Sequence, residues 1–268
     1  MKNPYLFEGM DSYDTPEGTP VSPIFQLMGK SRWYFYFDNF KTFIQTGNTA
    51  KHGKLDGEAQ IYYSSKNVRL IERCGGKLHI RGLNHLRETQ GKPHVLIGNH
   101  MSLLETALLH SIIRRHLDFS YIVKESLLTV PFFKHILLSF NSIPVTRDNP
   151  KEDLKRVLSQ GKEILKKGCS MIVFPQGTRS KDFDLAKFNT LGVKLAKSAG
   201  VPVLPIAIKT DFLDNGKWIK DLGPIHPERD VVFEFGAPIQ VEGNGQEANQ
   251  KCIDFIQSRF ENWKSQYK

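Results

Sequence analysis

Short apolar segments alternate with longer amphipathic ones along most of this chain, and this alternation constrains the fold more than any other feature. Buried strands are predicted at 77–83, 94–97, 119–123, 142–145, 171–174, 203–208 and 231–235. Helices are predicted at 102–116, 132–139 and 151–166, with a closing helix at 252–263. Because strands that alternate with helices tend to pair in one direction, we predict an α/β fold with a central mixed, largely parallel sheet flanked by helices.

The first 75 residues differ from the rest in composition and divide into two parts. Residues 1–20 are acidic and rich in Pro and Gly, which predicts a flexible acidic tail. Residues 21–75 are predicted to form an aromatic-rich helical motif, with a second helix at 58–73. Its first helix has helical spacing at Trp33, Tyr36, Phe37, Phe40 and Ile44. Such a helix either lies in a membrane interface or packs on the body as a core helix, and the sequence leaves both open.

The chain is basic, since 37 Lys and Arg residues stand against 28 Asp and Glu residues, for a formal net charge of +9. A basic body can bind nucleic acid, anionic lipid headgroups or an acidic carrier protein, or can serve solubility alone. The sequence has neither zinc-finger spacing nor the aromatic strand of an RNA-recognition motif. Nucleic-acid binding would therefore rest on charge alone, and we predict no nucleic-acid partner.

Segments for secretion, membrane spanning or metal binding are not predicted. The first residues lack the basic and apolar regions of a signal peptide. No apolar run approaches the ~18 residues of a transmembrane helix, so we expect no span, although binding at a membrane surface stays open. The cysteines lie too far apart for a disulfide scaffold or a Cys-x-x-Cys zinc site, and we predict no metal.

His100 is the first candidate catalytic residue because it follows the strand at 94–97 directly, in the sequence IGNHMSLLE. Side chains where a strand gives way to a helix often form the sites of α/β proteins. Within one helix His100 and Glu105 would point about 140° apart, so they can meet only if His100 lies in the turn before the helix. A carboxylate placed there orients the imidazole and favours the imidazolium formed when His takes a proton. Taken alone, the pair is also compatible with a structural His and a first-turn acid.

Two arginines follow the ends of two other predicted strands. Arg179 lies in FPQGTRS after the strand at 171–174, and Arg147 lies in SIPVTRD at the end of the strand at 142–145. A guanidinium binds phosphate or carboxylate through paired hydrogen bonds. Together with His100, the two arginines predict an anion-binding crevice that contains a base.

Four motifs in order resemble those of the glycerolipid and lysophospholipid acyltransferase superfamily: NHMSLLE, SIPVTRD, FPQGTRS and VPVLPIAI. The resemblance covers about residues 77–240 and is nearest to the 1-acylglycerol-3-phosphate acyltransferases. It implies that 76–268 is an acyltransferase domain with a closing C-terminal helix, preceded by a helical membrane-docking motif. It also implies an acyl thioester as co-substrate (acyl-CoA or acyl-carrier protein), no cofactor, and lysophosphatidic acid as acceptor. The expected location is peripheral, on the cytoplasmic face of a membrane.

The resemblance also implies roles for individual residues. His100 would be the general base that deprotonates the acceptor hydroxyl, with Glu105 orienting it. Arg147 and Arg179 would bind the acceptor phosphate in a pocket shaped by Gly177 and Thr178. The predicted substrate-binding residues are Lys124, Arg147, Gln176, Gly177, Thr178 and Arg179.

Three positions depart from the family's pattern. Glu105 replaces an Asp, Gln176 replaces a Glu, and Phe188-Asn189 stands where Phe-Lys is common. We expect the base chemistry to survive these changes, whereas the identity of the acceptor stays open. Two alternatives therefore remain, namely an acyltransferase for a different lyso-lipid and a catalytically weakened member that binds lipid. A hydrolase of the Gly-x-Ser-x-Gly type is excluded because that motif is missing.

Overall fold

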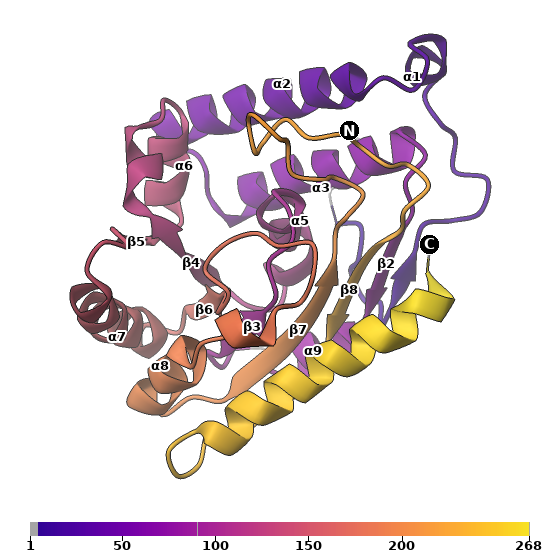
Figure 1. The fold of residues 1–268 in the computed structure, drawn as a ribbon. Helices are drawn as coiled ribbons and strands as arrows, with labels where there is room; N and C mark the ends of the chain where they lie inside the picture. The colour runs from indigo at the N-terminus through magenta and orange to yellow at the C-terminus, as the bar shows by residue number, and fades with distance from the viewer. Residues whose placement is uncertain (1–4, 90, 268) are drawn as a thin grey trace.

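A single mixed sheet forms the centre of the molecule. The computed structural model describes residues 5–89 and 91–267, and within them the sheet has eight strands in the order β1-β2-β8-β7-β3-β6-β4-β5. The strands are β1 (Tyr13–Asp14), β2 (Leu78–Arg81), β3 (Val95–Gly98), β4 (Phe119–Lys124), β5 (Ile143–Val145), β6 (Ser170–Val173), β7 (Val203–Lys209) and β8 (Val231–Phe235). Neighbours run parallel except in the pairs β1–β2 and β7–β8. The predicted α/β fold with a mixed, largely parallel sheet is therefore confirmed (Figure 1).

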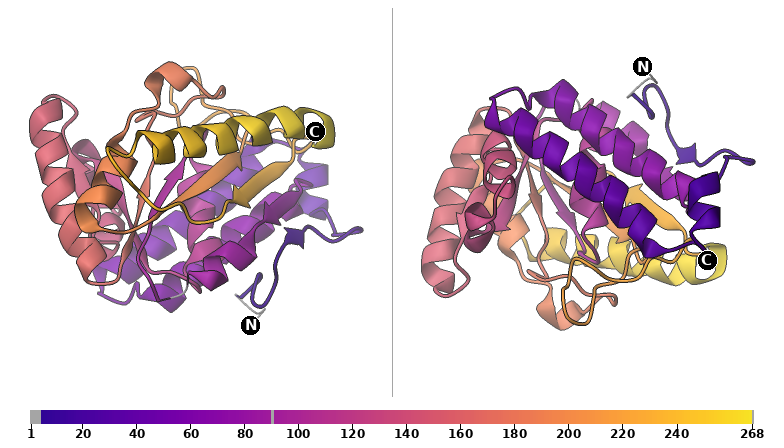
Figure 2. Two further views of the ribbon diagram at one scale, coloured as in Figure 1. Left: turned by 90° about the horizontal axis from the view of Figure 1, so that it is seen from below. Right: turned by 90° about the horizontal axis from the view of Figure 1, so that it is seen from above.

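Helices cover both faces of this sheet. The helices are α1 (Pro23–Leu27), α2 (Arg32–Lys51), α3 (Gly57–Arg73), α4 (Leu83–Glu88), α5 (Leu104–Ile113), α6 (Phe133–Ser139), α7 (Pro150–Lys166), α8 (Leu191–Ala199) and α9 (Gln246–Gln266), with the short 3-10 helices η1 (Glu125–Thr129) and η2 (Leu185–Lys187). One hydrophobic core joins the sheet to α2, α3 and α5, and a second joins it to α7, α8 and α9. The two layers lie on opposite sides of the sheet in Figures 1 and 2.

Strand β3 shows why the central strands consist of continuous apolar residues. Successive side chains of a strand point to opposite faces. Leu96 packs into the core under α3 and α5, whereas Val95 and Ile97 pack into the core under α8 and α9. Because both faces are covered, every residue of β3 is buried. Its carboxyl end lies between those of β6 and β7, which brings the loops after these strands together.

The aromatic-rich motif both packs on the body and leaves apolar side chains exposed. Ser22, Ser31 and Asp56 cap the first turns of α1, α2 and α3 with their side-chain oxygens. In α2 the side chains of Tyr34, Phe35 and Tyr36 are buried, whereas those of Trp33, Phe37 and Phe40 are exposed. No helix among the described residues is long and apolar enough to cross a bilayer.

The structure differs from the predicted elements in a few places. Tyr13 and Asp14, inside the predicted tail, form β1 and pair with β2, where Asp14 contacts His79 and Arg81. This part of the tail is thus bound to the sheet by partners more than sixty residues away, which no local pattern shows. Helices α4 and α8 were not predicted, and α9 begins at Gln246, before the predicted 252.

Candidate active site

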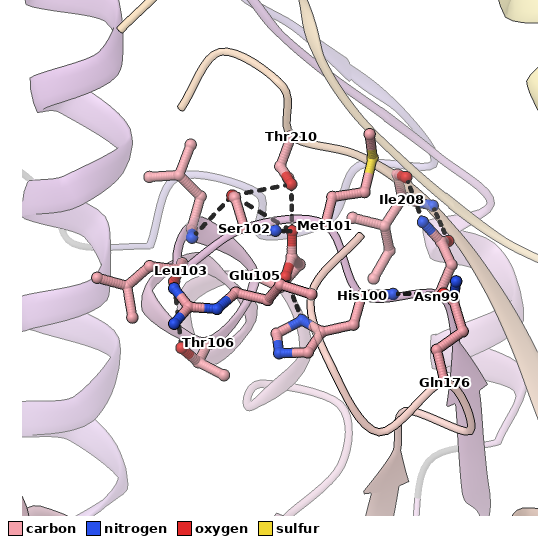
Figure 3. Close-up of polar contacts among 12 residues, drawn as sticks. Asn99, His100, Met101, Ser102, Leu103, Glu105, Thr106, Gln176, Ile208 and Thr210 are labelled. Carbon is pink, nitrogen blue, oxygen red and sulfur yellow. Dashed lines mark hydrogen bonds and ion pairs between the residues drawn. The ribbon is translucent and has the colours of Figure 1, made fainter. Parts of the chain in front are cut away.

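His100 and Glu105 form a hydrogen-bonded pair at the carboxyl end of β3. The strand ends at Gly98 and α5 begins at Leu104, so His100 lies in the turn between them, as the spacing predicts. Its Nδ1–H donates to Glu105 Oε2 at 2.6 Å (Figure 3). The Glu105 side chain is 0% exposed and that of His100 is 19% exposed. The carboxylate is thus removed from water, while the imidazole remains within reach of a substrate.

Donors from two other segments hold the second oxygen of Glu105. The backbone N–H of Ser102 donates to Oε1 at 2.8 Å, and the hydroxyl of Thr210, just after β7, also donates to it. The Ser102 hydroxyl lies 3.0 Å from that of Thr210 and accepts from the Leu104 N–H at 3.1 Å. The carboxylate is therefore fixed by hydrogen bonds on both oxygens, which a buried acid requires.

The ring and backbone of His100 are held independently of Glu105. The ring stacks on that of Phe174, with centroids 4.5 Å apart. The side-chain amide of Asn99 bonds to both backbone groups of Ile208, at 2.7 and 2.9 Å, and so ties the turn to β7. Among the described residues, Nε2 of His100 has no hydrogen-bond partner. With Nδ1–H donating to Glu105, Nε2 is left with its lone pair and can accept a proton.

The loop after β6 wraps the backbone of His100. Gln176 Oε1 accepts the His100 N–H at 3.1 Å, and the Ser180 N–H donates to the His100 carbonyl oxygen at 2.8 Å. Gly177, in this loop, has φ of +69°, a conformation that favours glycine. Gly177 and the side chain of Thr178 are exposed at the turn. The predicted convergence of the loops after β3 and β6 is therefore present in the structure.

Two residues that depart from the family pattern have defined contacts here. Gln176 also donates from Nε2 to the Asp182 carbonyl oxygen at 3.5 Å, so both ends of its amide are used. Asn189 donates from Nδ2 to the Pro175 carbonyl oxygen at 2.5 Å and accepts the Leu191 N–H at 2.9 Å. Both side chains stabilise the loop that surrounds His100.

Arg179 lies in the same loop, and its partner in this structure is a carboxylate. Its Nη1 is 2.7 Å from Asp221 Oδ1, with the two side chains 19% and 55% exposed. Because solvent screens a pair whose carboxylate is exposed, Arg179 can exchange Asp221 for another anion at little cost. Arg179 is thus available as the anion-binding group of this site.

Lys124 and Arg147 lie farther along the same edge of the sheet. Lys124 ends β4 and Arg147 follows β5, and the side chains of both are exposed. With strands about 4.8 Å apart, these ends lie roughly 10 and 14 Å from the end of β3. In the described part of the chain, neither side chain forms a hydrogen bond or ion pair with His100 or Arg179. The structure therefore brings His100, Glu105, Gln176 and Arg179 together, and sets the other two basic residues apart from them.

Sequence reasoning missed Thr210, Asp221 and Asn215. Thr210 comes two residues after the predicted strand at 203–208, which pairs with β3, so its position near a strand end was a usable signal. Asn215, whose Nδ2 donates to the Met101 carbonyl oxygen at 3.0 Å, and Asp221 lie in an irregular loop. No local pattern connects that loop with His100.

The three cysteines are not suited to act as nucleophiles. Burial raises the pKa of Cys74 and Cys252 to about 12 and that of Cys169 to about 11. Since the thiolate is the reactive form, these thiols are unreactive near neutral pH. Among the side chains described around this turn, His100 and Arg179 are therefore better candidates for the chemistry of the site than any of the cysteines.

Comparison with known proteins identifies relatives along most of the chain. The model of the family described as Acyltransferase matches residues 77–209, which include His100, Glu105, Gln176 and Arg179. A 1-acyl-sn-glycerol-3-phosphate acyltransferase of Pseudomonas aeruginosa is 36% identical over 194 residues, covering 72% of this chain and 69% of that protein. The chloroplastic enzyme LPAT1 of Arabidopsis thaliana is 33% identical over 132 residues, covering 49% of this chain and 36% of that protein.

A solved structure shares the fold. The crystal structure of the 1-acyl-sn-glycerophosphate (LPA) acyltransferase PlsC from Thermotoga maritima matches with a TM-score of 0.64 at 20% identity. The match covers 87% of this chain and 94% of that one. A match of this length is longer than the segment that contains the four motifs, so the shared fold extends beyond that segment.

Proposed function

Because the chain belongs to the acyltransferase family, among the 1-acylglycerol-3-phosphate acyltransferases, we propose that it moves a fatty acyl group from an acyl thioester to the free hydroxyl of lysophosphatidic acid. The single observation that carries this proposal is the pairing of His100 with the buried Glu105 in a turn wrapped by the loop that bears Arg179. A base and an anion-binding group in adjacent loops match an acceptor that carries both a hydroxyl and a phosphate.

In the proposed reaction His100 acts as the general base. Its Nε2 takes the proton of the acceptor hydroxyl as the hydroxyl oxygen attacks the carbonyl carbon of the thioester. The carbon–sulfur bond then breaks, and the departing thiolate takes the proton from the imidazolium. Glu105, 2.6 Å from Nδ1, holds the ring in the required tautomer and stabilises the imidazolium. Direct transfer needs no protein nucleophile, in agreement with the raised pKa values of the cysteines.

Arg179 is the residue that we propose binds the acceptor phosphate first. It comes from the loop whose Ser180 contacts the backbone of His100, so a phosphate at Arg179 lies in the same crevice as the base. Lys124 and Arg147 extend the basic edge along the ends of β4 and β5. Lys124 and Arg147 can therefore contact a phosphate only if the substrate extends along this edge of the sheet.

The substrates point to a membrane surface, where the lyso-lipid is found. The exposed apolar side chains of α1 and α2, namely Ile24, Leu27, Met28, Trp33, Phe37 and Phe40, support peripheral binding through the N-terminal motif. We propose that the protein acts there, on the cytoplasmic face, with acyl-CoA or acyl-carrier protein as donor. The net charge of +9 suits both an anionic lipid surface and an acidic carrier protein.

Acyl transfer by the purified protein tests the proposal. Lysophosphatidic acid, lysophosphatidylethanolamine and lysophosphatidylcholine are offered side by side, each with a long-chain acyl-CoA and with the acyl-carrier protein thioester. Transfer to lysophosphatidic acid that His100→Ala abolishes, and that His52→Ala on the exposed end of α2 leaves intact, supports the base and the acceptor. Transfer only to a lyso-lipid with a headgroup assigns a different acceptor. No transfer to any acceptor refutes the proposal.

A further inference from the structure

The segment between β7 and β8 presents an exposed tryptophan beside the site. Residues 214–224, which we call the Trp218 loop, carry Trp218 at 98% exposure together with Ile219 and Leu222, both also exposed. A side chain as large and apolar as tryptophan is rarely left fully in water without a partner. Its position calls for a physical explanation.

The exposure of Trp218 is built into the loop. Backbone hydrogen bonds from Asp214 to Pro224 and from Gly216 to Lys220 close it at 3.0 and 3.1 Å. The loop is also tied to α2, because the Tyr36 hydroxyl donates to the Gly223 carbonyl oxygen at 2.8 Å. Figure 1 shows this segment running beside α2. The tryptophan is therefore held outward by an ordered loop.

Basic side chains surround the exposed apolar ones. Lys217 and Lys220 flank Trp218 and Ile219 in the sequence, and both are exposed. Within the described residues neither lysine forms an ion pair with a carboxylate. Tryptophan with flanking lysines is the composition found at the interface between the headgroups and the hydrocarbon of a bilayer. The positive charge selects an anionic surface.

The loop also borders a hollow near the site. Between it and the start of α2 lies a hollow of about 640 Å³, whose lining includes Trp33, Lys181, Asn215 and Leu222. Asn215 bonds to Met101, the residue after His100, and Lys181 follows Ser180, which bonds to His100 itself. The hollow at Trp218 therefore lies beside the two loops that hold His100.

We propose that the Trp218 loop is an anionic-lipid contact beside the site, and that its Asp221 holds Arg179 until the acceptor's phosphate replaces it. Trp218 and Ile219 enter the headgroup layer, and Lys217 and Lys220 pair with lipid phosphates. Because Asp221 is 55% exposed, solvent screens its pair with Arg179, and a phosphate can displace it. The second part of the proposal rests on the proposed function, whereas the lipid contact does not.

Vesicle binding tests the lipid contact without any turnover. We expect Trp218→Ala to lower flotation with vesicles of phosphatidylcholine and phosphatidylglycerol about tenfold. Lys217→Ser combined with Lys220→Ser should lower it about thirtyfold, and only when phosphatidylglycerol is present.

The control variants remove the same kinds of side chain, one apolar and two basic, from other parts of the surface. Met10→Ala removes an exposed apolar side chain near the N-terminus, and Lys251→Ser with Lys264→Ser removes two charges from α9. Unchanged flotation of the Trp218 and double-lysine variants, with thermal unfolding like wild type, would overturn the lipid contact and leave the loop as a surface for a protein partner.

Direct binding of a phosphate-bearing lyso-lipid tests whether Asp221 competes for Arg179. A short-chain lysophosphatidic acid is titrated calorimetrically against wild type and Asp221→Asn, with Glu261→Gln on α9 as a control that removes the same charge. We expect Asp221→Asn to bind two- to fivefold more tightly, because the competing carboxylate is gone. Weaker or equal binding would overturn this part. Since neither experiment requires acyl transfer, a protein that transfers to no acceptor would refute the proposed function and leave the lipid-contact result standing.

Discussion

Glu105→Gln tests how the buried carboxylate supports the base. Oε1 of Glu105 accepts from the Ser102 N–H and the Thr210 hydroxyl, whereas Oε2 accepts from His100. A glutamine at this position keeps its carbonyl oxygen where two donors point, so its NH₂ group faces Nδ1 of His100. Nδ1 must then accept, the ring proton moves to Nε2, and the nitrogen that has to take the acceptor's proton is blocked.

The expected loss is large because both the tautomer and the charge are wrong. An orienting carboxylate replaced by its amide costs about 10⁴ in kcat in serine proteases, and a general base contributes about 10²–10⁴. We therefore expect Glu105→Gln to lower kcat by about 10³–10⁴, equivalent to roughly 4–5.5 kcal/mol in the barrier. Glu105→Asp keeps the charge but is one methylene shorter, so it cannot span from His100 to Thr210, and it should lose only about 10- to 100-fold.

Initial rates of acyl transfer at saturating donor and acceptor measure these losses. Thermal unfolding of each variant controls for the fold, because Glu105 is fully buried. If the folded Glu105→Gln protein keeps its kcat within about tenfold of wild type, Glu105 does not set the tautomer of His100, and the reasoning from these hydrogen bonds is refuted.

Three further changes have defined outcomes. Arg179→Ala removes the charged donor proposed for the acceptor phosphate, and should raise KM for lysophosphatidic acid about 10- to 100-fold in steady-state assays. His110 is fully buried beside Arg114, and burial holds its pKa well below the usual value. Below a pH of about 6.5 the unfolded chain therefore binds a proton that the folded chain does not. The free energy of unfolding then decreases as the pH is lowered, by up to about 1.4 kcal/mol per pH unit. Denaturant unfolding measured between pH 7 and pH 5 should show that His110→Phe loses less stability than wild type, with a difference of up to about 1.4 kcal/mol for each pH unit below about 6.5. Gly82→Ala places a Cβ 2.0 Å from the Phe235 carbonyl oxygen at a φ of +74°. It should cost about 2 kcal/mol or more and lower the midpoint of thermal unfolding by at least about 4 °C.

The sequence predicted the features that depend on local pattern. Strands β3 and β7 were predicted because each is a continuous apolar run with helices on both faces. The meeting of His100 with Glu105 was predicted because Gly98 and Asn99 break the strand before the helix begins. Features that depend on distant partners were missed: β1, for example, forms only because β2 is beside it. The contact of Thr210 with Glu105 joins residues 105 positions apart.

The three departures from the family pattern form one connected set, and this argues against a weakened site. The extra methylene of Glu105 lets it bridge His100 to the end of β7. Gln176 meets a backbone donor at one end and a backbone acceptor at the other, and a Glu could serve only the first. Asn189 bonds to Pro175, the residue before Gln176, so both side chains support the same loop. Relative to the pattern, Gln176 removes a negative charge and Asn189 removes a positive one, so the formal charge of the segment that carries both residues is unchanged. The two substitutions therefore keep both the hydrogen bonds and the formal charge of the loop beside His100.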